Sequence, residues 1–169
     1  MSTAVRVIRP AQPEDMQALV TFRQEYCKET YRGFDVLCDL KDDEQWIASY
    51  KAWMQDPAMQ VRLLYLDDVL KAFSACRIDA ASAHSEIVEL QCLPDTPPEE
   101  SLKLVESVLK ELRTLGVSQV TVWVLRDNLR SRFHYQQLGF KPDGNSRETQ
   151  VSGETLSWTR YIYFLKEPQ

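Results

Sequence analysis

The chain has 169 residues, 44% of them hydrophobic, and a net charge of −5 from 20 Lys and Arg against 25 Asp and Glu. This length is typical of one domain, and this apolar fraction supplies a core without disulfides or a structural metal. The acidic excess disfavours proteins that bind the phosphate backbone of nucleic acids. We therefore expect a single domain, residues 1–169, with no nucleic-acid partner.

The cysteines and histidines are scattered, without metal-ligand spacing: Cys27, Cys38, Cys76, Cys92, His84 and His134. The opening MSTAVRVIRP lacks the apolar stretch of a secretory signal, and no apolar run approaches the roughly 18 residues of a membrane span. These features predict a reduced, soluble, cytoplasmic protein with no metal and no membrane partner.

The first elements predicted are a strand over 5–9, closed by Pro10, and a helix that opens at Pro13. A second helix is expected over 42–54, where Trp46, Ile47, Tyr50 and Trp53 recur at helical spacing. In this aromatic-rich first third, two interpretations remain open. The rings line an acceptor site, or they pack the helices on a sheet.

Strands are then expected over 60–66, 69–78 and 86–93, the first two joined as a hairpin by Asp67 and Asp68. A helix over 97–115 leads into an apolar strand over 118–125. This strand–helix–strand unit requires two parallel neighbours, whereas the hairpins require antiparallel ones. The chain is thus α/β or α+β, with one mixed central sheet and helices on both faces.

The last elements predicted are a short helix over 128–138, ended by Gly139, and an aromatic-rich strand over 156–165. The stretch 142–153, dense in proline and glycine, is interpreted as a loop. On the short helix, Leu129, Phe133 and Phe140 are expected to be buried against the sheet.

The segment NLRSRFHYQQLGF, Asn128–Phe140, and the order of elements resemble the GNAT superfamily of N-acetyltransferases. The resemblance covers nearly the whole chain. It implies a GNAT-like domain whose mostly antiparallel sheet of about seven strands contains a splayed parallel pair.

Asn128, Arg132 and Tyr135 are spaced to share one face of the short helix. In the family this face lines the groove for acyl-CoA. The resemblance implies that Asn128 and Arg132 bind the cofactor and that Tyr135 protonates the leaving thiolate. The alternative is a half-buried Tyr135 with its hydroxyl in water.

The resemblance extends to EIVELQCLPD, which begins at Glu86. It implies that the backbone of Gln91, Cys92 and Leu93 binds the pantetheine arm of acetyl-CoA, and that Glu86 is the general base. Period-2 alternation places Glu86 on the face of Leu90 and Cys92. The alternative is a Glu86 without a catalytic role.

The chain departs from the family in the loop that follows. Where the family has glycines that bind the CoA pyrophosphate, this chain has Asp95-Thr96-Pro97-Pro98-Glu99-Glu100-Ser101. Thr96 and Glu99 have the spacing of a capping box, which predicts a helix end closed by its own side chains and weak binding of CoA. Arg126, Arg130 and Arg132 are alternative phosphate contacts.

Two functions follow from the resemblance. The first is an N-acetyltransferase that moves an acetyl group from acetyl-CoA to a primary amine of a small molecule or protein. A homodimer is compatible with this function. The second is an inactive GNAT-fold binding or regulatory module that has lost acetyl-CoA binding.

Overall fold

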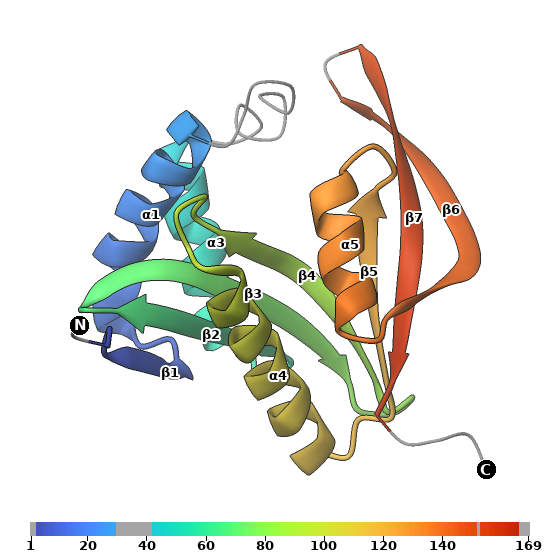
Figure 1. Cartoon of the computed structure of the whole chain (residues 1–169), viewed down its shortest axis with the longest axis horizontal. Coiled ribbons are helices and arrows are strands. Elements are labelled where there is room, and N and C mark those ends of the chain that lie inside the picture. The colour runs from blue at the N-terminus through green and yellow to red at the C-terminus, as the bar shows by residue number, and fades with distance from the viewer. Residues whose placement is uncertain (1–2, 30–41, 152, 166–169) are drawn as a thin grey trace. The chain divides into compact units, whose positions relative to one another are not determined.

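A computed structural model describes residues 3–29, 42–151 and 153–165. Its elements are, in order, β1 (Arg6–Pro10), η1 (Pro13–Asp15), α1 (Met16–Glu29), α3 (Asp43–Gln55), β2 (Met59–Leu66), β3 (Val69–Asp79), β4 (His84–Cys92), α4 (Pro98–Thr114), β5 (Gln119–Leu125), α5 (Leu129–Gln137), β6 (Lys141–Val151) and β7 (Glu154–Phe164) (Figure 1). Every strand and helix predicted from the sequence is present, with its ends moved by a few residues at most.

The strands form one seven-stranded sheet in the order β1-β2-β3-β4-β5-β7-β6. The pairs β1–β2, β5–β7 and β6–β7 are antiparallel, and β4 runs parallel to β5. The parallel register extends from His84↔Gln119 to Ile87↔Val122. The predicted mixed sheet and its parallel strand pair are thus confirmed.

The chain divides into two compact units. The first comprises Met1–Cys76 and Glu89–Val108, and the second comprises Arg77–Val88 and Leu109–Gln169. Strands β3 and β4 and helix α4 contribute residues to both. Each unit is therefore described separately below.

In the first unit, helices cover both faces of the sheet. On one face, the fully buried Phe73 of β3 meets Phe22 of α1 and Tyr50 of α3, with ring centroids 5.4 and 5.9 Å apart. The neighbouring Ala72 points the other way and packs in a core cluster with Leu104 of α4. The predicted placement of helices on both faces holds in this unit.

The start of α1 is fixed by a buried carboxylate. Asp15 accepts two hydrogen bonds of 2.7 Å from the guanidinium of Arg9, one of 2.7 Å from the amide of Gln12 and one of 2.8 Å from the hydroxyl of Tyr65. The hydrogen bonds from Arg9, supported by the other two donors, lower the pKa of Asp15 to about 2. The network links β1, η1 and β2 directly before α1 begins.

In the second unit, α5 packs on β7 through aromatic rings. Tyr135 of α5 lies 5.3 Å from Phe140, and Phe140 lies 5.2 Å from Tyr163 of β7. Gly139 ends the helix with a φ of +96°, and a Cβ there would come within 3.2 Å of the Tyr163 ring. Glycine is therefore required at this position for its conformation and for the close approach.

The expected burial of Leu129 and Phe133 is wrong, although Phe140 is buried as predicted. Leu129 is 69% exposed and Phe133 62% exposed. Helix α5 packs through the stripe that includes Tyr135, which leaves the stripe of Leu129 and Phe133 on the surface.

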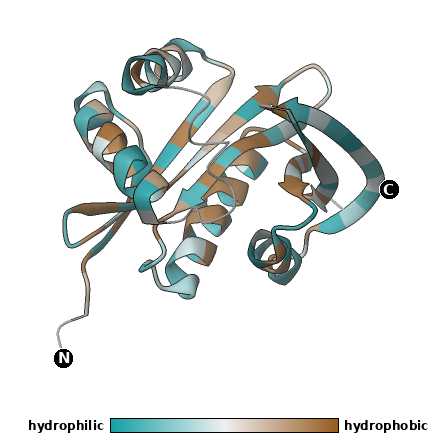
Figure 2. Ribbon diagram, turned by 90° about the horizontal axis from the view of Figure 1, so that it is seen from above, coloured by the Kyte–Doolittle hydropathy of each residue, from teal (hydrophilic) through white to brown (hydrophobic). Residues whose placement is uncertain are grey.

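The expected loop over 142–153 is also wrong, because most of it is strand β6. This strand pairs with β7 along its length, with a register shift between Pro142 and Ser146. It lies at the edge of the sheet and is hydrophilic (Figure 2), so its composition resembles that of a loop. An edge strand with an irregular register tolerates proline and glycine.

The cysteines differ from the expected fully reduced set. Cys27 is disulfide-bonded, whereas Cys76 and Cys92 form no disulfide. Burial raises the pKa of Cys76 to about 12, so its thiol stays protonated at neutral pH. None of the helices within the described ranges is long and apolar enough to cross a membrane.

Candidate functional site

The parallel strand pair places Glu86 next to a buried hydroxyl. Glu86 of β4 is half-buried and lies in register with Thr121 of β5, whose Oγ1 is 2.8 Å from Nε2 of His84. Thr121 in turn pairs with Ile162 of β7. Because side chains alternate along a strand, this face is opposite to that of Tyr161, the neighbour of Ile162.

Asn128 caps the N-terminus of α5. Its side-chain oxygen accepts a 3.1 Å hydrogen bond from the amide of Ser131. Asn128 is therefore the N-cap residue of α5, and its carbonyl accepts a 3.1 Å hydrogen bond from the amide of Arg132, so the expected shared face with Arg132 and Tyr135 stays a prediction. The cap uses the oxygen of the carboxamide, and the NH₂ group takes no part in that bond.

Arg132 binds to its own protein unit. Its Nε donates to the hydroxyl of the fully buried Tyr161 at 3.1 Å, and its Nη1 donates to the carbonyl of Arg126 at 3.0 Å. These two bonds attach α5 to β7 and to the end of the β5–α5 connection. Nε and Nη1 of Arg132, the residue expected to bind the cofactor, therefore already donate hydrogen bonds within the protein.

Tyr135 is 4% exposed, which is more buried than the half-buried alternative expected for it. Its ring packs edge-on against Phe140 and against His134, whose centroid is 5.6 Å away. Burial, with the charge of Arg130, lowers the pKa of His134. The ring of Tyr135 is therefore held firmly beside an uncharged imidazole at neutral pH.

The three residues expected to bind pantetheine through their backbone lie in the first unit. The amide of Leu93 donates to the carbonyl of Lys71 at 2.9 Å, so it is committed to β3. Successive amides of an extended strand point to opposite edges, so the amide of Cys92 points away from β3. Gln91 and Cys92 are half-buried, and the side chain of Cys92 packs against the core cluster of Ala72 and Leu104.

The structure assigns the predicted site residues to two groups. Glu86, Asn128, Arg132 and Tyr135 belong to the second unit. Gln91, Cys92 and Leu93 belong to the first. Within the second unit, α5 packs on the sheet face that carries Tyr161 and Tyr163, which is opposite to the face of Glu86.

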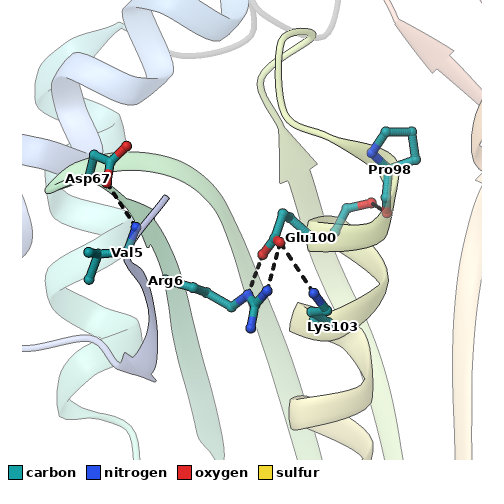
Figure 3. A network of polar contacts seen from close by, with 7 residues as sticks. Val5, Arg6, Asp67, Pro98, Glu100 and Lys103 are labelled. Carbon is teal, nitrogen blue, oxygen red and sulfur yellow. Dashed lines mark hydrogen bonds and ion pairs between the residues drawn. The ribbon is translucent and has the colours of Figure 1, made fainter. Parts of the chain in front are cut away.

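The predicted capping box at α4 is wrong. The helix begins at Pro98, and the buried hydroxyl of Thr96 donates to the carbonyl of Lys71 at 3.0 Å. Glu100, one residue beyond the predicted capping glutamate, instead receives hydrogen bonds from Arg6 and Lys103 (Figure 3). Arg6 is 94 positions away in the chain, so no local pattern could have identified this partner.

The aromatic residues of α3 belong to the core, as the packing interpretation predicted. Trp46 is 6% and Tyr50 1% exposed, and both face the interior with Phe73 beneath Tyr50. The guanidinium of Arg23 lies 3.7 Å from the centre of the Trp46 ring. Burial raises the pKa of Tyr50, so its phenol is neutral throughout the physiological range.

A cavity of about 540 Å³ lies in the first unit, and it was not anticipated from the sequence. It is bounded by α1, by Tyr65, by the start of β3 and by Leu93 and Asp95. Across these walls, Lys71 forms an ion pair of 2.6 Å with Asp95. The cavity thus reaches one of the residues expected to bind the cofactor, Leu93.

Neither a protein-family model nor a curated protein sequence matches the chain. Its fold is similar to that of the ribosomal-protein-S18-alanine N-acetyltransferase from Escherichia coli, with a TM-score of 0.75 and 14% identity over 98% of this chain and 97% of that one. An acetyltransferase of the GNAT family from Streptococcus pneumoniae gives 0.74 and 18% over 95% and 99%. A putative acetyltransferase from Salmonella typhimurium, solved with its cofactor acetyl-CoA, gives 0.72 and 18% over 96% and 95%. These likenesses establish the fold.

Proposed function

We propose that this chain, whose fold is that of the GNAT acetyltransferases, is an N-acetyltransferase that moves an acetyl group from acetyl-CoA to a primary amine. The observation that carries the proposal is the match over at least 95% of the chain to three acetyltransferases, one of them holding acetyl-CoA. The acceptor is an amine of a small molecule or a protein.

Transfer proceeds by direct attack. The neutral amine nitrogen attacks the carbonyl carbon of the thioester, the C–N bond forms, and the C–S bond then breaks. Glu86 takes the proton that the amine must lose, directly or through one water. Tyr135 gives its phenolic proton to the departing thiolate.

The donor is bound through its pantetheine arm. The backbone of the segment Gln91–Leu93 pairs with the arm, and one of its amides polarises the thioester carbonyl. In the second unit, the NH₂ group of Asn128 is a hydrogen-bond donor for acetyl-CoA. Arg132 positions Asn128 indirectly, because its bonds to Tyr161 and to the Arg126 carbonyl hold the start of α5 in place.

The test is a calorimetric titration with acetyl-CoA and with desulfo-CoA, followed by mass spectrometry of a panel of primary amines incubated with acetyl-CoA. Binding of both nucleotides and enzyme-dependent acetylation of at least one amine are expected. Binding without acetylation of any amine would contradict the proposed transfer, whereas the second function, a GNAT-fold module that has lost acetyl-CoA binding, predicts that neither nucleotide binds. Absence of binding would overturn the proposed function.

The homodimer suggested by the resemblance belongs to the same proposal. Light scattering of the purified protein at two concentrations measures its mass directly. A mass of one chain at both concentrations would exclude the dimer and leave the transfer reaction unaffected.

A further inference from the structure

The first turn of α4 offers few free donors to a phosphate. Pro97 and Pro98 have no N–H, and the amides of Glu100 and Ser101 donate to the carbonyl of Pro97 at 2.9 and 3.4 Å. A helix N-terminus binds phosphate through the amides of its first turn when they are unpaired. This helix end is therefore depleted of the groups that a pyrophosphate would need.

An internal carboxylate lies in the first turn of this helix. Glu100, whose side chain is 12% exposed, accepts hydrogen bonds from Nε and Nη2 of Arg6, the second at 2.8 Å, and lies 3.3 Å from Nζ of Lys103 (Figure 3). The bonds from Arg6 hold the pKa of Glu100 below its ordinary value, so it stays ionised at neutral pH. Its single negative charge lies close to both cations and in the first turn, where it favours the helix dipole.

The next cation along this edge is also engaged. Lys71 pairs with Asp95 at 2.6 Å, and its carbonyl accepts from Thr96 and Leu93. Arg6, Lys103 and Lys71 are thus already paired with carboxylates, and a donor phosphate at this end would have to compete with these carboxylates for their charge. It would also meet the charge of Glu99, which is exposed.

We propose that Glu100 takes the place of a donor phosphate at this helix end, and that the chain selects acyl-pantetheine thioesters by their arm, with little contribution from the ADP part of CoA. This inference rests on the proposed function. It differs from weak binding in general, because it assigns the loss to one carboxylate and predicts that a donor without the ADP part is used equally well. The bonds formed and broken in the transfer are unchanged.

The test compares acetyl-CoA with S-acetyl-pantetheine as ligands and as donors. In the unaltered protein, the two dissociation constants should agree within about threefold. Glu100→Gln removes the internal anion and releases Arg6 and Lys103, so acetyl-CoA should bind about tenfold more tightly or better, with S-acetyl-pantetheine unchanged.

Glu99→Gln is the matched control, since it removes the same charge from the same turn and leaves the Glu100 pairs intact. It should change the ratio of the two constants by less than about twofold. Preference of the unaltered protein for acetyl-CoA by about tenfold or more would overturn this inference alone. The comparison of the two thioesters uses the unaltered protein alone, so its result does not depend on whether a variant folds.

A Glu100→Gln protein with an unchanged ratio would overturn the assignment to Glu100. Failure of both thioesters to bind would overturn the proposed function and this inference with it. The two failures are thus distinguishable.

Discussion

Arg132 donates its Nε hydrogen to the hydroxyl of Tyr161 across 3.1 Å, and so joins helix α5 to strand β7. The acceptor is fully buried, and the same guanidinium also holds the carbonyl of Arg126. Arg132 is half-buried, on the side of α5 that packs on β7. Its two hydrogen bonds connect α5 to β7 and to the β5–α5 connection.

We expect a double-mutant cycle to detect this contact. Tyr161→Phe and Arg132→Met should each lower the free energy of unfolding by about 1 kcal/mol or more, with a coupling energy of about 0.5–1.5 kcal/mol in urea titrations. A contact made chiefly with the cofactor would give a different result. Arg132→Met would then raise the KM for acetyl-CoA and leave stability unchanged.

Tyr135→Phe tests the proposed general acid. The phenylalanine ring keeps the edge contact with Phe140, so the fold should be preserved. Removing the proton donor should lower kcat by about 100-fold with little change in KM, measured as thiol release from acetyl-CoA.

Tyr163→Phe is the control for Tyr135→Phe. Tyr163 lies on the far side of the same ring stack, against Phe140. It should retain kcat within about twofold. Equal effects of the two substitutions would assign Tyr135 to packing and remove its catalytic role.

The sequence predicted those elements whose signals are local. The hairpin at Asp67 and Asp68 was identified from two turn residues, which adopt φ values of 48° and 64°. The parallel pair β4–β5 followed from a strand–helix–strand pattern, because such a crossover permits only parallel neighbours. In both cases the information lies within about 40 residues of chain.

The errors concern choices that distant residues decide. A nine-residue helix can bury either of two stripes, and the contact of Tyr135 with Phe140 and β7 selected the one without Leu129. Strand β6 is polar and contains glycine and proline, so only its partner β7 identifies it as a strand. The ion pair between Arg6 and Glu100 likewise joins residues that are 94 positions apart in the chain.

The carboxylate of Asp15 should make the protein sensitive to acid. Its pKa is about 2 in the folded chain, below its ordinary 3.8, so its contribution to stability is complete above about pH 4. That contribution, about 2 kcal/mol, is lost as the pH falls through 2, because the unfolded state binds the proton first.

Asp15→Asn should therefore be less stable than the unaltered protein at pH 7 by about 2 kcal/mol, and the difference should shrink towards pH 2. Urea unfolding at a series of pH values measures it. Asp68→Asn is the control, since Asp68 is exposed in the hairpin turn and asparagine tolerates its positive φ. A constant difference between pH 7 and pH 2 for Asp15→Asn would contradict the assignment.

Substitutions of Thr96 distinguish two roles of its hydroxyl, a hydrogen-bond donor to β3 or the N-cap acceptor of α4. In the structure its hydroxyl donates to the carbonyl of Lys71, and the residue is 4% exposed. Thr96→Asp supplies a strong N-cap acceptor but no hydrogen to donate, so it should lower the free energy of unfolding by about 2 kcal/mol or more. Thr96→Val, which leaves the carbonyl unpaired, should cost about 1–3 kcal/mol. Thr96→Ser keeps the donor and should lose less than either. These values are read from urea titrations at pH 7.

If Thr96 capped α4, the Thr96→Asp protein would be as stable as the unaltered protein or more stable, because aspartate is among the best N-cap residues and its charge favours the helix dipole. A stable Thr96→Asp protein would therefore restore the capping box that the sequence suggested.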